Sequence, residues 1–244
     1  MSQNMLLDIV YITLLTVMAG AFIPLGGLLA SLERLSPGWL EQEFRHFLIA
    51  LGGGILLGAV AVVLVPQGKD SMGDSLWAIP AIIFGGLLFF IIERVLGLKR
   101  RESPQLMGVM LDFIPEATAL GGLAIVSPST AWLLAILIAL QNLPEGFNAY
   151  RELCDLGYTS RKTLAFMTVL VGAGPLAGLS GYFLLSGQPV ILGAIMLIAS
   201  GGILYLIFQD IAPQSRLDRH WGPPLGAVIG FCVALFSHDV MVHF

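Results

Sequence analysis

Two stretches of the sequence place oxygen-bearing side chains four residues apart. Asp112 and Glu116 form one pair, and Gln141 and Glu145 form the other. Residues i and i+4 lie on the same side of an α-helix, so each stretch would present two such side chains to one neighbour. Carboxylate and amide oxygens are ligands that divalent cations accept. The spacing therefore indicates a cation site between two helices.

Both pairs fall in the middle of long apolar segments, where an unpaired carboxylate is costly. A charged side chain at the centre of a bilayer costs about 2.5–3.5 kcal/mol on insertion scales. No Lys or Arg lies near the middle of either segment. The remaining partners are a metal ion, protons, or neighbouring polar side chains such as Asn142, Asn148 and Thr118. A protonated carboxyl group that is hydrogen-bonded to a neighbour is thus the alternative to a metal site.

A proline precedes each of the two glutamates, as Pro115 and Pro144. A proline inside a helix removes one backbone hydrogen bond and clashes with the carbonyl four residues earlier. We expect the freed carbonyls to be those of Leu111 and Leu140. Free carbonyls and carboxylates on one side of a kinked helix form a plausible set of cation ligands.

The composition indicates which elements must position these residues. The 244 residues are 57% hydrophobic and 11% charged, with a mean hydropathy of +0.88, whereas soluble domains contain about 25% charged residues. A membrane-spanning helix needs about 20 apolar residues. The sequence predicts an all-α integral membrane protein with a single domain, 1–244, in the lipid bilayer. Eight spans are expected, at 5–32, 45–67, 76–97, 105–126, 130–153, 160–185, 189–213 and 222–243.

The basic residues predict the orientation of these spans. Lys and Arg concentrate in the cytoplasmic loops of membrane proteins. If the eight spans alternate in direction, eleven of the 12 Lys and Arg residues are on one side of the membrane and only Lys69 is on the other. The eleven are Arg34, Arg45, Arg94, Lys99, Arg100, Arg101, Arg151, Arg161, Lys162, Arg216 and Arg219. We therefore expect both termini outside, in a multi-pass protein of the cell (inner) membrane.

Two internal similarities suggest a repeat. The stretch 112–117 resembles 141–146, and, more weakly, 53–56 with Pro66-Gln67 resembles 201–204 with Pro213-Gln214. Transporters often have repeated halves around a central binding site. The similarities fit three helices, a central pair and three more helices.

Other residues are less informative. Asp210, near the cytoplasmic end of the span 189–213, is either an interfacial residue facing water or a stopping point for a cation at the inner exit. We find no phosphate-binding loop, dinucleotide fingerprint or nucleophile elbow, so neither an enzyme nor an organic cofactor is expected. An intramembrane metalloenzyme is disfavoured because the cluster lacks histidine. The basic residues carry no aromatic interleaving that would indicate nucleic acid.

With these motifs the sequence resembles the ZIP (Zrt/Irt-like) metal transporters, nearest their GufA-like bacterial branch. The stretch Gln141-Asn-Leu-Pro-Glu-Gly146 is close to the motif of the fifth helix in that branch. Pro115-Glu116, followed by Ala119-Leu120-Gly121, is similar to the fourth-helix motif His-Asn-x-Pro-Glu-Gly-x-Ala. Ile203-Leu204-Tyr205 with Asp210 and Pro213 resembles the seventh helix.

The resemblance implies eight helices in a 3+2+3 arrangement, uptake of a divalent metal ion toward the cytoplasm, and a homodimer. It places Glu116, Gln141 and Glu145 in the primary metal site, with Asp112 where the family has histidine. Asn142 matches a ligand of a second, bridged metal position, and Asp210 matches the acid of the seventh helix.

The chain also departs from the family pattern. Phe113 replaces an asparagine of the second metal position, and Gly174 stands where the branch commonly has glutamate. We therefore expect one metal position, made only of oxygen ligands. Carboxylates and carbonyls suit manganese, whereas imidazole suits zinc and iron. We therefore expect weaker selectivity for zinc than in the family. Zinc, manganese and iron all remain candidate substrates. The alternative is a transport-inactive relative with a structural or regulatory role in the membrane.

Overall fold

The chain is helical throughout the part that the structure describes. This computed structural model describes residues 3–32, 38–73, 75–97, 104–217 and 221–243, and these ranges contain no strand. The helices are α1 (Gln3–Leu32), α2 (Gly38–Ala59), η1 (Val60–Leu64), α3 (Val65–Ser71), α4 (Ala78–Gly97), α5 (Pro104–Leu123), α6 (Pro128–Asp155), α7 (Ser160–Leu170), α8 (Ala173–Leu185), α9 (Pro189–Leu206), η2 (Ile207–Ile211), α10 (Ala212–Ser215) and α11 (Pro223–His243).

The predicted spans correspond to these helices, some of them in two or three pieces. Proline occupies the first position of four helices, α5, α6, α9 and α11, where its missing N–H costs nothing. Among the described residues, seven helical stretches are long and apolar enough to cross a membrane. The predicted span 105–126 corresponds to α5, which carries Asp112 and Glu116. The helical membrane class is confirmed, while the count of eight stays a prediction.

The outer surface of the bundle is apolar and much of its polar chemistry is inside. Trp221, Leu176 and Val169 are each more than 70% exposed, whereas Asp112, Glu116 and Gln141 are buried. A water-soluble monomer rarely exposes large apolar patches. This distribution, together with the seven apolar stretches, is that of a multi-pass membrane protein.

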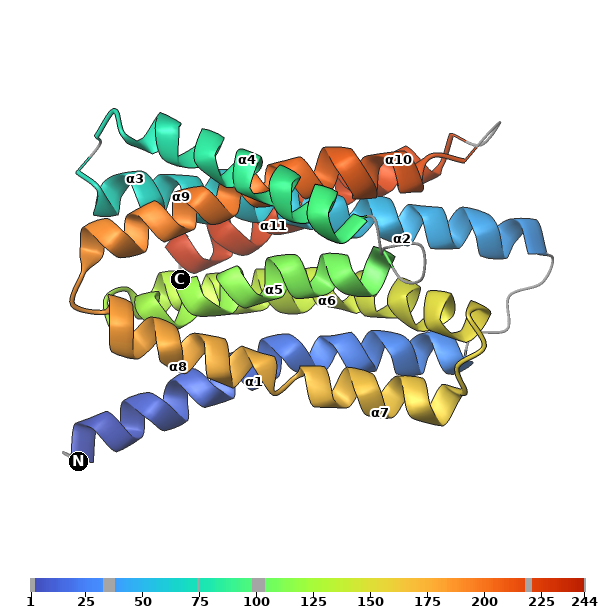
Figure 1. Cartoon of the computed structure of the whole chain (residues 1–244), viewed down its shortest axis with the longest axis horizontal. Helices are drawn as coiled ribbons and strands as arrows, with labels where there is room; N and C mark the ends of the chain where they lie inside the picture. The colour runs from blue at the N-terminus through green and yellow to red at the C-terminus, as the bar shows by residue number, and fades with distance from the viewer. Residues whose placement is uncertain (1–2, 33–37, 74, 98–103, 218–220, 244) are drawn as a thin grey trace.

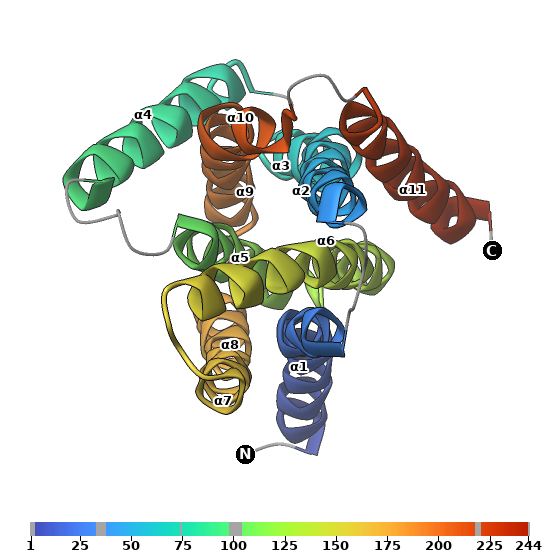
Figure 2. The ribbon, with the colours of Figure 1, turned by 90° about the vertical axis from the view of Figure 1, so that its right-hand side faces the viewer.

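The helices form two groups that meet along α5 and α6 (Figure 2). One group contains α1, α5, α6, α7 and α8, and the other contains α2, α3, α4, α9, α10 and α11. The most extensive packing is between α1 and α6, α2 and α11, α4 and α9, and α5 and α8. The helix with the largest number of buried residues in the described part is α6, whose buried face includes Gln141, Asn142 and Glu145.

Glycines bring α1 and α6 into backbone contact at the depth of the carboxylates. A Cβ atom on Gly146 would overlap the carbonyl oxygen of Ile23, and a Cβ atom on Gly26 would overlap that of Leu143. Small residues allow such close approach between membrane helices, where van der Waals packing drives association. The glycine after Glu145 therefore fixes α1 against the helix that carries the site.

Two π-helical segments occur at equivalent places in the weaker of the two internal sequence similarities, the one that includes Pro66 and Pro213. The segments η1 and η2 each end two residues before a proline, Pro66 and Pro213. In each, the residue after the segment donates its N–H to the carbonyl five residues earlier. The two stretches run in opposite directions through the bundle (Figure 1). Single π-helical turns are frequent at functional sites.

The ends of the bundle fit the predicted charge asymmetry in part. The N-terminal end of α1 and the C-terminal end of α11 both lie toward the left of Figure 1. The helix ends nearest to Arg45, Arg94, Arg151, Arg161 and Arg216 lie toward the right. Arg34, Lys99, Arg100, Arg101 and Arg219 are outside the described residues. Which end faces the cytoplasm stays a prediction.

Candidate metal centre

The structure brings the two predicted pairs together between α5 and α6. Glu116 and Gln141 are fully buried, Asp112 is 3% exposed and Glu145 is 9% exposed. Asp112 and Glu145 line the same cavity, and Glu116 is hydrogen-bonded to Gln141. Pro115 and Pro144 lie inside their helices as the sequence predicts, and the role of the carbonyls of Leu111 and Leu140 stays a prediction.

One hydrogen bond crosses the cluster. The Nε2 atom of Gln141 donates to Oε2 of Glu116 at 2.7 Å. This contact joins α6 to α5 and neutralises none of the negative charge. Because the amide nitrogen of Gln141 is engaged, its oxygen is the atom left to face a ligand.

Several buried oxygen atoms of the cluster have no hydrogen-bond partner. They are Oδ1 of Asp112, Oε1 of Glu116, Oε1 of Gln141 and both Oε atoms of Glu145. An unsatisfied buried polar group costs about 1–3 kcal/mol, and more when it is charged. Nearly all buried polar groups in proteins are paired. Five acceptors together therefore indicate that this cluster takes up protons or a cation.

A small cavity connects the cluster to Asp210. The cavity has a volume of about 30 Å³ and is lined by Asp112, Glu145, Asp210 and Gln214 together with Gly108, Val109, Leu206 and Ile211. A water molecule needs roughly 10–15 Å³ measured in this way, so the cavity has room for an ion or about two waters. It lies where α5 and α6 of one helix group meet α9, η2 and α10 of the other.

Asn142, the predicted ligand of a second metal position, is directed toward α1. Its Nδ2 atom donates to the carbonyl oxygen of Ala19 at 2.9 Å, and its Oδ1 atom is buried without a partner. The residue does not line the cavity between Asp112 and Asp210. Asn142 therefore fastens α1 to α6, as the neighbouring glycine contacts do, and its amide oxygen remains available.

Phe113 and Gly174, the two departures from the second metal position, contact each other. The ring of Phe113 is fully buried. A Cβ atom on Gly174 would be 2.8 Å from Cζ of Phe113, and one on Gly20 would be 2.9 Å from the same atom. The aromatic ring thus fills the space that a side chain at position 174 would occupy, and it does so with carbon instead of ligand oxygen.

In its present arrangement the cluster is not a finished coordination sphere. Among the described residues, no three His, Cys, Asp or Glu side chains are grouped closely enough to hold a metal ion directly. The hydrogen bond between Gln141 and Glu116 occupies one of the oxygens that an ion would need. Ion binding therefore requires side-chain movement, for which the unpaired oxygens provide the driving force.

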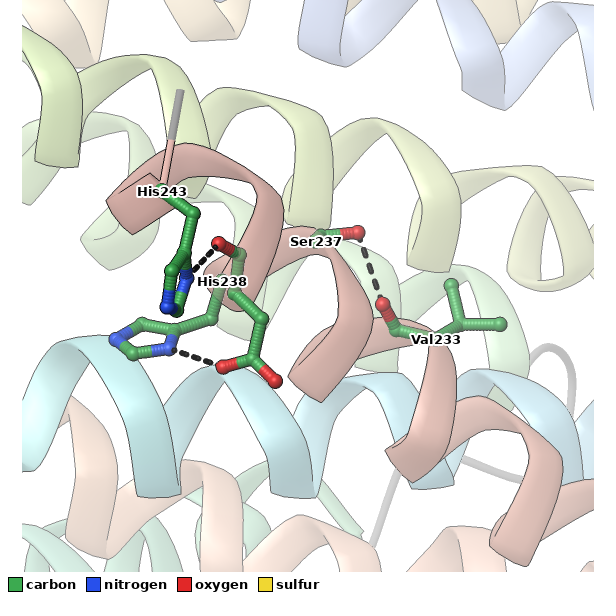
Figure 3. A network of polar contacts seen from close by, with 5 residues as sticks. Val233, Ser237, His238 and His243 are labelled. Atoms are coloured by element: carbon green, nitrogen blue, oxygen red, sulfur yellow. Dashed lines mark hydrogen bonds and ion pairs between the residues drawn. The ribbon is translucent and has the colours of Figure 1, made fainter.

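Ser237 and His238 are adjacent in the sequence but do not form a hydrolase-type catalytic pair. Ser237 donates its hydroxyl hydrogen to the carbonyl of Val233 at 2.8 Å, one helical turn earlier. The ring of His238 contacts Asp239 instead (Figure 3). A nucleophile must be within hydrogen-bond reach of its base, so these neighbours in sequence make no catalytic pair here.

Two sequence comparisons with known proteins yield no match. A scan against models of protein families finds none that fits the chain, and a search of curated proteins finds no similar sequence. The resemblance to metal transporters accordingly depends on the motifs themselves.

Sequence reasoning missed Gln214 as a residue of the cavity. The signal was present in the pair Pro213-Gln214, which repeats Pro66-Gln67, but the one-residue difference in spacing weakened it. Sequence reasoning also did not identify Gly108 and Leu206 as lining residues of the cavity, because glycine and leucine side chains carry no functional group that would indicate a site.

Proposed function

We propose that the chain transports a divalent metal ion across the membrane, as the ZIP transporters that it resembles do. Asp112, Glu116, Gln141 and Glu145 bind one ion, and Asp210 with Gln214 borders the route from it toward the cytoplasm. The observation that carries the proposal is the group of buried, unpaired oxygens on α5 and α6. No Lys or Arg lies near the middle of either helix to neutralise them.

The position of the cluster also suits transport. The cavity beside it lies between the two helix groups, next to a π-helical turn and a proline in η2 and α10. Relative movement of the groups would alter access to the cavity from either side, which is the requirement for alternating access. The predicted orientation makes the direction uptake into the cytoplasm, in the cell (inner) membrane.

The ligand atoms support a hard or borderline ion. Every proposed ligand donates oxygen, which favours manganese, while zinc and iron remain possible substrates because they also accept carboxylate. The ion binds as substrate, and binding replaces the hydrogen bond between Gln141 and Glu116.

Metal accumulation in cells tests the proposal. Cells that express the wild type should accumulate manganese or zinc faster than cells expressing Glu116→Gln or Glu145→Gln. The control is Asp155→Asn, which changes an exposed acid at the end of α6 that contacts Arg45 at 3.7 Å; such surface pairs contribute little. Equal accumulation in all four strains would refute transport and favour the structural or regulatory alternative.

A further inference from the structure

A second polar cavity lies near the end of the bundle that contains α3, toward the left of Figure 1. It has a volume of about 220 Å³ and is lined by Gln67, Asp70, Ser129, Thr130 and His238, besides apolar residues of η1, α6 and α11. Lys69 precedes Asp70 in sequence but does not line the cavity. The volume exceeds that needed for several water molecules. The cavity can therefore hold an ion together with part of its hydration shell.

The donors in this cavity differ from those of the inner cluster. One carboxylate, one imidazole, one carboxamide and two hydroxyl groups line it. The Nδ1 atom of His238 contacts Oδ1 of Asp239 at 3.3 Å (Figure 3). A carboxylate on one ring nitrogen is the usual arrangement for a histidine whose other nitrogen binds a metal ion. This contact engages Nδ1 and leaves the Nε2 atom of His238 available to bind a metal ion.

The repeated π-helical segments make the two cavities counterparts. Gln214 follows Pro213 after η2 and lines the inner cavity. Gln67 follows Pro66 after η1 and lines the outer one. Because the two stretches run in opposite directions, equivalent positions lie at opposite ends of the bundle (Figure 1). Each cavity also has an acid near the glutamine, Asp210 or Asp70.

We propose that the cavity around Asp70 and His238 is a separate binding site for a partly hydrated divalent cation of the zinc class. Zinc accepts imidazole and carboxylate ligands and completes its coordination with water. One imidazole and one carboxylate are available, so the ion keeps several waters and exchanges readily. This site lies outside the carboxylate cluster, and ion binding there does not depend on whether the inner cluster transports metal.

Zinc titration of purified protein in a background without the inner cluster tests this proposal. In Glu116→Gln/Glu145→Gln protein, isothermal titration calorimetry should detect one bound zinc ion. Adding His238→Gln or Asp70→Asn should weaken that binding at least about tenfold, because each removes one of the two strongest protein ligands. His243→Gln is the matched control, since His243 is on the same helix but bonds the backbone of Asp239 at 2.8 Å. It should leave zinc affinity unchanged.

X-ray absorption at the zinc edge provides a second measurement that does not depend on affinity. The background protein should show one imidazole ligand, and His238→Gln should remove it. Absence of bound zinc in the background protein would overturn the proposal. A zinc affinity in the His238→Gln and Asp70→Asn variants equal to that of the background protein would also overturn it. Loss of transport by the inner-cluster variants affects neither result.

Discussion

Gln141 on α6 donates a hydrogen bond of 2.7 Å to Glu116 on α5, and this bond is the direct link between the two helices inside the carboxylate cluster. It holds one glutamate oxygen and leaves the other without a partner. In the absence of an ion, the Gln141 amide group therefore supplies a hydrogen-bond donor to one buried carboxylate oxygen that the ion would otherwise bind.

Replacing Gln141 by the similarly sized Met should destabilise the protein and weaken ion binding. Glu116 would lose its donor, which costs about 1–3 kcal/mol of unfolding free energy, and the ion would lose an oxygen ligand. Denaturation in detergent and manganese titration measure the two effects. Asn148→Leu is the control, because Asn148 donates to the Pro144 carbonyl at 2.8 Å on the same helix and should affect stability alone. An unchanged manganese affinity in Gln141→Met would remove Gln141 from the ligand set.

Replacing Asp112 by His should raise the affinity for zinc relative to that for manganese. Asp112 lines the cavity with Glu145 and Asp210, and imidazole is a better ligand for zinc than for manganese. Competition titrations of purified protein with both ions give the ratio. If the substitution lowers both affinities by the same factor, Asp112 does not contact the ion.

Manganese binding should weaken as the pH falls from about 8 to 5. Protons and the ion compete for the same carboxylate oxygens, and a ligand must be deprotonated to bind a metal. Lower pH therefore opposes binding and higher pH favours it. Glu145→Gln, which removes one of the competing carboxylates, should make the dependence shallower. A flat profile for the wild type would contradict a carboxylate site.

Gly146→Ala should separate α1 from α6 and impair uptake. The added methyl group would overlap the Ile23 carbonyl oxygen, and backbone atoms cannot give way as a flexible side chain can. Overpacking of this kind costs about 1–3 kcal/mol. Thermal denaturation and uptake assays check the two effects. Gly187→Ala is the control, since nothing lies within 4 Å of its Cβ position. Equal stability of the two variants would mean that the contact between α1 and α6 is dispensable.

The sequence predicted the helices better than it predicted their contacts. Apolar length and proline positions define the spans, because both act locally along the chain. The i, i+4 spacing also predicted that Asp112 and Glu116 share a side of α5. It could not predict which helix that side faces, because rotation of a helix depends on its packing against neighbours.

Asn142 and Phe113 illustrate what local patterns leave out. Asn142 is next to Gln141, yet one residue turns a side chain by about 100° around the helix, and its amide reaches α1. Phe113 is next to Asp112, and its ring fills the space beside Gly174. The π-helical turns could not be predicted either, because no residue type in the five positions before Pro66 or Pro213 indicates a turn with an extra residue.

The cluster between α5 and α6 should bind one ion, because Phe113 fills the space next to Gly174. Isothermal titration calorimetry with manganese should lose one bound ion between the wild type and Glu116→Gln/Glu145→Gln. Gly174→Glu alone should destabilise the fold, since its Cβ atom would be 2.8 Å from Cζ of Phe113. Combining it with Phe113→Asn relieves that contact and supplies two new oxygen ligands. The double variant should therefore be more stable than Gly174→Glu alone and should bind a second ion in the cluster. Two ions in the wild-type cluster would show that the ring of Phe113 does not exclude the second position.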